Sequence, residues 1–88
     1  SLTFGNASAR LASVLLIYTT SFGIKQEDGI VIPIPLTHKD IANLVGVARE
    51  TVSIELKKFI DKGLIQKSGR FLAVKNKKAL EKAAEKEY

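Results

Sequence analysis

The sequence predicts one small α+β domain, mostly helical, with a β-hairpin beside a helical core. Its 88 residues leave room for a single domain. Apolar residues recur every three or four positions along several segments, which is the periodicity of helices packed on a core. A β-branched and aromatic segment at 64–75, interrupted by Ser68-Gly69, has the pattern of a hairpin. With 45% hydrophobic and 26% charged residues, the chain has the composition of a folded protein and not of a disordered tail.

The composition also excludes several classes of function. The chain has no Cys and one His, which leaves no disulfide, no thiolate metal site and no cysteine nucleophile. No apolar run reaches the roughly 18 to 20 residues that span a bilayer, and no signal peptide is visible. We therefore expect a cytoplasmic binding domain that is not an enzyme, with no membrane partner and no metal or cofactor of its own.

The first predicted helix begins after Asn6, a good N-cap residue, and ends at Gly23. Its apolar residues at helical spacing are Leu11, Val14, Leu15, Tyr18 and Phe22. Leu16 and Ile17 widen this stripe beyond one face. Either the helix is deeply buried, or it also packs on something outside these 88 residues.

The segment after the first helix predicts a loop and then a strand. Ile24–Gly29 is mostly polar and ends in Asp28-Gly29, a turn signal. Ile30–Pro35 is β-branched but contains two prolines. Because proline cannot donate to a β-ladder, this segment predicts a short edge strand.

Two helices joined by a tight turn follow. Thr37 and Asp40 resemble a capping box at the start of a short helix, which Gly46 ends. The residues of this short helix that we expect to point inward are Ile41, Ala42, Leu44 and Val45. A longer helix covers 49–62 and ends before Gly63, a good left-handed cap. Its apolar set is Val52, Leu56, Phe59 and Ile60.

The rest of the chain completes a recognisable order of elements. The hairpin covers 64–75, and Asn76 is a cap for a last helix over 77–88. The small apolar stripe that we expect to dock this helix on the domain is Ala79, Leu80, Ala83 and Ala84. Two helices with a tight glycine turn, followed at once by a hairpin, predict a winged helix-turn-helix, with the helix-turn-helix at 37–62 and the wing at 64–75.

The positive charge is concentrated in these same elements. The formal net charge of the chain is +5. Residues 37–75 carry +4 of it, residues 1–36 carry none, and residues 76–88 carry +1. A concentrated basic patch attracts polyanions by counterion release and steering. The simpler alternative is a solvated face that keeps the protein soluble.

The outward face of helix 49–62 carries candidate base-reading residues. Arg49 can fork onto guanine O6 and N7, Glu50 can accept from cytosine N4, and Ser53 suits several bases. The alternative for Arg49 and Glu50 is a helix-start pair in which Glu50 merely favours the dipole.

The segments Leu36–Ala42 and Gly46–Ser53, with Arg-Glu-Thr-Val at 49–52 as the most specific run, resemble the C-terminal domain of Crp–Fnr family regulators. Ser8–Ala12 and the wing extend the resemblance in weaker form. It implies a bacterial transcription regulator that binds an inverted repeat of double-stranded DNA as a homodimer. It also implies a separate N-terminal sensor domain, with residues 1–6 as the hinge and 7–88 as the DNA-binding domain.

The resemblance implies roles for single residues as well. It gives Arg49, Glu50 and Ser53 as base readers, whereas the residues expected to contact phosphate are Thr37, His38, Lys39, Thr51, Lys57, Ser68 and Arg70. At residue 54 the family often has a third base-reading Arg, but this chain has Ile54, which can meet a thymine methyl or be an ordinary exposed residue. At residue 48 a Ser or Thr would cap the helix and touch phosphate, and Ala48 does neither.

Two further expectations concern partners. A cyclic nucleotide or other effector would bind the N-terminal sensor domain, and RNA polymerase is a candidate partner of the regulator. The alternative function is a winged-helix module for protein–protein interaction without sequence-specific DNA binding, since a fold does not by itself define a function. Exposed basic residues on the second helix and the hairpin favour DNA over a protein partner.

Overall fold

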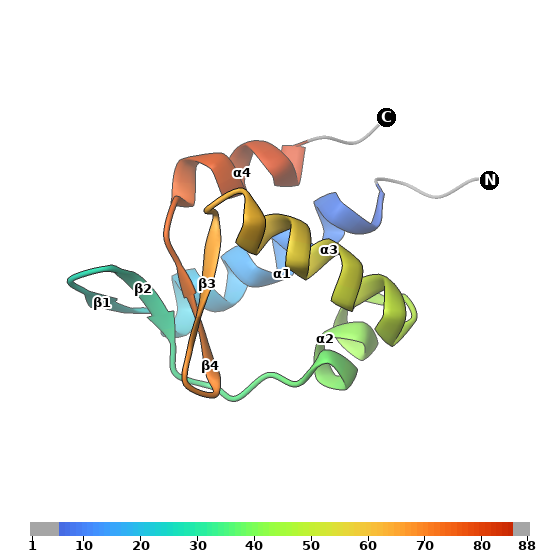
Figure 1. The fold of residues 1–88 in the computed structure, drawn as a ribbon, viewed down its shortest axis with the longest axis horizontal. Helices are drawn as coiled ribbons and strands as arrows, with labels where there is room; N and C mark the ends of the chain where they lie inside the picture. Colours follow the sequence, from blue (N-terminus) through green and yellow to red (C-terminus); the bar gives the residue numbers. More distant parts are fainter. Residues whose placement is uncertain (1–5, 86–88) are drawn as a thin grey trace.

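The computed structural model describes residues 6–85 (Figure 1). Most of the predicted hinge at 1–6 and the end of the predicted helix 77–88 lie outside these residues. The elements, in chain order, are α1 (Ala7–Phe22), β1 (Ile24–Gln26), β2 (Gly29–Ile32), α2 (His38–Val45), α3 (Arg49–Asp61), β3 (Ile65–Ser68), β4 (Phe71–Val74) and α4 (Lys77–Glu85). The predicted fold class, a winged helix-turn-helix with a helical core and a β-hairpin, is confirmed.

The predicted helix ends are formed as the sequence indicated. Asn6 Oδ1 accepts the N–H of Ala9 at 2.7 Å, and Asn76 Oδ1 accepts that of Ala79 at 3.0 Å. After α3, the N–H of Gly63 donates to the Ile60 carbonyl at 3.0 Å, and that of Leu64 to the Phe59 carbonyl at 2.9 Å. This pair of bonds is a Schellman motif, which places Gly63 at φ +79° in the left-handed region.

The predicted loop and edge strand after α1 are wrong in two respects. Residues 24–26 form strand β1, and β2 is an interior strand of an antiparallel sheet with the order β1-β2-β4-β3. The prolines do not prevent this, because β2 ends at Ile32 and Pro33 lies beyond its last pair with β4. A Cβ at Gly29 would lie 2.5 Å from the Val74 carbonyl oxygen, so the close approach of β2 to β4 requires glycine there.

The core lies between the helices and one face of the sheet. Its fully buried large side chains are Leu11, Leu15, Ile32, Ile41, Ile65, Leu80, Val52 and Val74. Leu44 was expected to point inward, but its side chain is 47% exposed. The buried face of α2 is only as wide as Ile41, Ala42 and Val45, because an eight-residue helix packs along one stripe.

Helix α4 lies against α1 on the side opposite the tip of the β3–β4 hairpin (Figure 1). Leu80 is fully buried, and Ala79, Ala83 and Ala84 pack partly buried on the core, as the small-residue stripe predicted. In α1, Ile17 is 61% exposed and Leu16 is half-buried, so the helix is not buried on all sides. Within residues 6–85, no helix is long and apolar enough to cross a membrane.

Candidate nucleic-acid interface

Helix α3 has one face in the core and one face free. Val52, Leu56 and Phe59 are buried, which fixes the rotation of the helix about its axis. That rotation leaves the four candidate base-reading residues exposed together at the N-terminal half of the helix: Arg49, Glu50, Ser53 and Ile54. Ile54 is 57% exposed, so its side chain is accessible to a partner.

The start of α3 has no side-chain cap. Ala48 has the extended backbone of an N-cap residue, with φ −71° and ψ 154°, but no hydroxyl or carboxylate to accept a first-turn N–H. These donors lie at the positive end of the helix dipole, next to the exposed Arg49. The end of α3 that carries the base-reading candidates is therefore open to an anion.

Helix α2 begins with a complete capping box. The Thr37 hydroxyl accepts the N–H of Asp40 at 3.0 Å, and Oδ2 of Asp40 accepts the N–H of Thr37 at 3.0 Å. The bond from the Thr37 backbone, with a further contribution from the Thr37 side chain, lowers the pKa of Asp40 below its ordinary value. The predicted capping box is confirmed.

One hydrogen bond joins the two helices on their exposed side. Nδ1 of His38, the first residue of α2, lies 2.8 Å from Oγ of Ser53 on the free face of α3. His38 is half-buried, whereas Ser53 is exposed. A phosphate-contact candidate and a base-reading candidate are thus in direct contact.

Two hollows border this contact. The first, of about 250 Å³, lies between the start of α2, the middle of α3 and the tip of the wing, and is lined by Pro35, Leu36, Thr37, His38, Leu56, Lys67, Gly69, Arg70, Phe71 and Leu72. The second, of about 200 Å³, is lined by His38, Ser53, Leu56, Lys57, Ile60 and Lys67. His38 lines both hollows. Three phosphate-contact candidates line the first hollow: Thr37 and His38 from the start of α2, and Arg70 from the wing.

Lys67 borders both hollows, although the sequence did not single it out. Alternate residues of a strand share a face, and Lys67 therefore lies on the same side of β3 as the buried Ile65. Strand alternation could therefore have identified Lys67 from the sequence. For the same reason Ser68 lies on the other side, where it lines a hollow over the outer face of the sheet with Ile24 and Val31.

The remaining candidates differ in their exposure and in the contacts that their side chains make. Lys39 is exposed and Thr51 is half-buried, and neither lines the two hollows. Lys57 forms a solvent-exposed ion pair with Asp61, with 3.0 Å between Nζ and Oδ2. At the tip of the wing, the Arg70 guanidinium lies over the Phe71 ring, 5.4 Å from its centroid, and this contact limits the orientations of the side chain.

A residue far away in the sequence fixes the turn between the helices. Nη2 of Arg10 in α1 donates to the Val45 carbonyl at 2.5 Å and to the Gly46 carbonyl at 3.4 Å. Gly46 has φ +83°, in the left-handed region. Sequence reasoning missed this role of Arg10, because its partners lie 35 and 36 residues away and no local pattern connects them.

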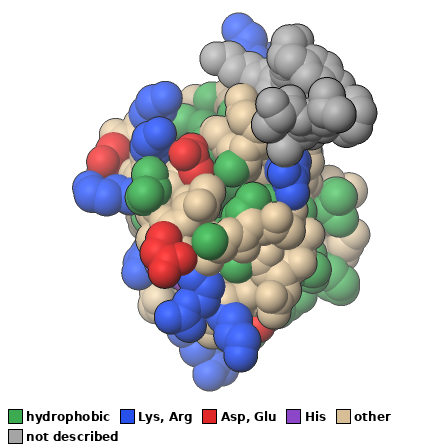
Figure 2. Space-filling view, turned by 90° about the vertical axis from the view of Figure 1, so that its right-hand side faces the viewer, with side chains coloured by type: hydrophobic (Ala, Val, Ile, Leu, Met, Phe, Trp, Pro, Cys, Tyr) green, Lys and Arg blue, Asp and Glu red, His purple; other side chains and the backbone are tan. Residues whose placement is uncertain are grey.

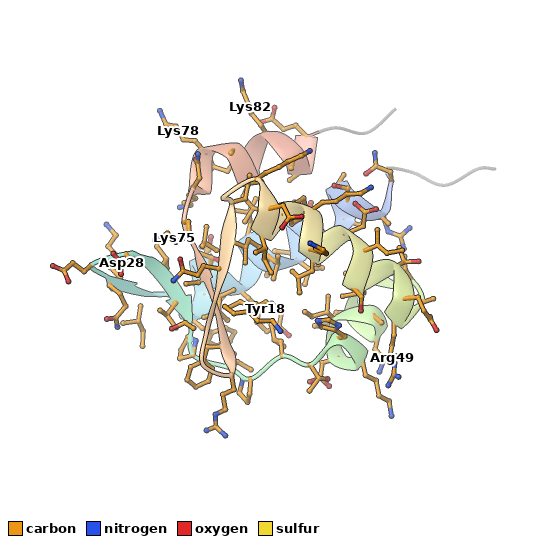
Figure 3. All side chains as sticks on the ribbon, viewed as in Figure 1. Tyr18, Asp28, Arg49, Lys75, Lys78 and Lys82 are labelled. Carbon is orange, nitrogen blue, oxygen red and sulfur yellow. The ribbon has the colours of Figure 1, made fainter. Side chains whose placement is uncertain are left out.

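The start of α3 lies at the end of the molecule opposite α4 (Figure 1). Figure 3 shows Arg49 at the free end of α3, far from Lys78 and Lys82 on α4. Figure 2 shows Lys and Arg side chains gathered at the lower end of the face that it displays. Helix α3 packs on the core by one face, follows α2 after a tight turn, and is followed by a hairpin with basic residues near its tip. These features define a winged helix-turn-helix DNA-binding domain.

Known proteins give this class a family. Residues 9–83 match the Crp-like helix-turn-helix domain. The chain is 31% identical over 83 residues to the CRP-like cAMP-activated global transcriptional regulator of Mycobacterium tuberculosis, which covers 94% of this chain and 37% of that protein. It is 38% identical over 64 residues to the anaerobic regulatory protein of Bacillus subtilis, covering 70% of this chain and 27% of that protein.

A solved structure agrees with these relatives. The CO-dependent transcription factor CooA from Carboxydothermus hydrogenoformans superimposes with a TM-score of 0.84 at 30% identity, over 90% of this chain and 37% of that one. The chain belongs to the Crp-like helix-turn-helix family and is a DNA-binding domain of the Crp–Fnr type. It spans between 27% and 37% of the length of these three proteins.

Proposed function

We propose that this domain binds an inverted repeat of double-stranded DNA as one half of a homodimer, with the first turns of α3 in the major groove. In this arrangement Arg49, Glu50 and Ser53 face base edges, and Ile54 meets a thymine methyl. The phosphate-contact candidates are Thr37, His38, Lys39, Thr51, Lys57, Ser68 and Arg70. Residues 1–6 form the hinge to a sensor domain, residues 7–88 are the DNA-binding domain, and the regulator acts in the cytoplasm with RNA polymerase as a partner.

The observation that carries the proposal is the hollow between α2, α3 and the wing. Thr37 and His38 reach it from the start of α2, and Arg70 reaches it from the tip of the wing. Side chains that donate hydrogen bonds or carry positive charge thus surround a space beside the base-reading face. Donors of this kind can contact phosphate oxygens and so fix the register of the helix that enters the groove.

Within this interface the candidates divide by the surface on which they lie. Thr37, His38, Lys57 and Arg70 border the hollows beside α3, and we assign them to the backbone of the bound half-site. Ser68 lines the outer face of the sheet, so it meets DNA only where the duplex extends past the wing. Substitution of Ser68 should therefore matter for long duplexes more than for short ones.

Selection from random duplex DNA tests the proposal. The chain should be made dimeric through a coiled coil fused to its N-terminus, since a monomer would contact only one half of an inverted repeat. We expect an enriched inverted repeat whose affinity falls steeply with salt. Lys39→Ala should weaken binding to all sequences and lower the salt slope by about one unit. Recovery of no enriched motif by the dimer would refute the proposed function.

A further inference from the structure

The His38–Ser53 bond links the predicted phosphate-reading and base-reading parts of the interface. These residues lie 15 positions apart in the sequence, and the 2.8 Å contact joins the first residue of α2 to the free face of α3. His38 also lines both hollows beside α3, together with Leu56 and Lys67. The hydrogen that one of these side chains uses in this bond therefore decides what the other can offer to DNA.

The hydrogens available to this pair are few. A serine hydroxyl has one hydrogen, and a neutral imidazole has one N–H on either of its nitrogens. Either Ser53 donates to a bare Nδ1, or a protonated Nδ1 donates to Ser53 Oγ. The first arrangement uses the only hydrogen of Ser53, and the second leaves it available for DNA.

A phosphate contact through Nε2 of His38, which the proposed function implies, would select between the two arrangements of a neutral ring. Phosphate oxygens only accept hydrogen bonds, so His38 can contact one only through an N–H at Nε2. In a neutral ring this leaves Nδ1 bare, and Ser53 then donates to it. The ammonium group of Lys67, which lines the same hollow as Ser53, only donates and offers the hydroxyl no alternative acceptor.

We propose that His38 is a specificity-determining residue that acts through Ser53. When His38 accepts the hydrogen of the Ser53 hydroxyl, Ser53 Oγ can only accept a hydrogen bond from a base. Ser53 then selects a base that offers a donor in the major groove, the exocyclic amine of cytosine or adenine. The inference rests on the proposed function and names a base preference that Ser53 alone, as donor and acceptor, would not have.

Two substitutions of His38 separate this role from a merely structural one. His38→Arg keeps a donor for phosphate, but a guanidinium only donates, so it releases the Ser53 hydrogen. His38→Gln keeps both a donor for phosphate and an acceptor for Ser53. Both variants thus keep a donor for phosphate, charged in arginine and neutral in glutamine, and they are opposite in their effect on Ser53.

The experiment is a selection from random duplexes with the coiled-coil dimer, carried out for the wild type and for H38R, H38Q, S53A and H38R/S53A. The base pair at which S53A loses preference defines the Ser53 position. There, H38R should shift the preference from amine-bearing bases toward guanine or thymine by roughly 5- to 10-fold, the factor expected of one hydrogen bond. H38Q should keep the wild-type preference. Thermal unfolding of each variant establishes that it is folded.

The outcomes are distinguishable. A wild type that selects a motif, together with an H38R variant whose preference at the Ser53 position is unchanged, overturns this inference and leaves the proposed function standing. An equal shift caused by H38R in the S53A background also overturns it, because the effect would not pass through Ser53. Failure of the wild type to select any motif overturns both.

Discussion

Helices α2 and α3 are neighbours in the chain but are held in different ways. The start of α2 is closed by the reciprocal Thr37–Asp40 box, and its end is held by Arg10 through the Val45 and Gly46 carbonyls. The start of α3 has Ala48 and no side-chain cap. Helix α2 is therefore fixed by contacts within the domain, whereas no side chain caps the first-turn donors of α3, which face an approaching partner.

Removal of the Arg10 contact should have the largest effect on stability. Arg10→Ala deletes a charged donor and leaves the Val45 carbonyl without it, at a cost of about 2 kcal/mol in the free energy of unfolding. Urea denaturation measures this cost. Arg10→Lys is the matched control, because it keeps the charge but has no planar fork to span two carbonyls, and it should lie between alanine and wild type. Equal stability of the alanine variant would mean that Arg10 does not fix the turn.

Removal of the α2 cap should come next. Thr37→Ala loses the hydroxyl that accepts the Asp40 N–H and should cost about 1 kcal/mol. Thr37→Ser keeps the hydroxyl and should cost much less. The pair is compared by thermal denaturation, and similar losses in both variants would contradict a capping role.

Addition of a cap to α3 should act in the opposite direction. Ala48→Ser supplies an acceptor for a first-turn N–H on a backbone that already has N-cap geometry, and should stabilise the domain by about 0.5–1 kcal/mol. Ala48→Val, which adds bulk without an acceptor, serves as the control. If serine gives no gain in denaturation experiments, the first-turn donors of α3 are already satisfied in the free domain.

The smallest effect should appear at acid pH. The folded-state pKa of Asp40 lies below its unfolded value of 3.8, so this carboxylate stabilises the domain above that value, and the contribution is lost as the pH falls through the folded pKa. The stability difference between wild type and Asp40→Asn should therefore shrink below about pH 4. A difference that stays constant from pH 6 to pH 3 would show that the carboxylate charge does not contribute.

Local patterns predicted most of the fold. The caps at Asn6, Thr37 and Asn76, the turn at Gly46 and the apolar faces of α3 and α4 were all readable, because each depends on residues within one or two turns of helix. The interior position of β2 was not readable. It depends on pairing with β4, some 40 residues further along the chain, which no local pattern encodes.

In the candidate interface, too, local patterns predict some features, whereas others depend on contacts between distant segments. Helical periodicity predicted which α3 residues are exposed, and strand alternation could have placed Lys67 and Ser68 on opposite sides. The Arg10 contact and the His38–Ser53 bond required the structure, since each joins side chains from elements that meet only after folding. Leu44 was misjudged because an apolar residue need not be buried on a short helix.

Base reading by the first turns of α3 is tested most directly at Arg49. The dimerised wild type and Arg49→Ala should be compared by binding to the selected duplex and to each of its single-base-pair variants. We predict that Arg49→Ala loses about 1–3 kcal/mol per half-site and no longer discriminates at one base pair, while preferences elsewhere persist. An unchanged preference at every position would contradict base reading by α3.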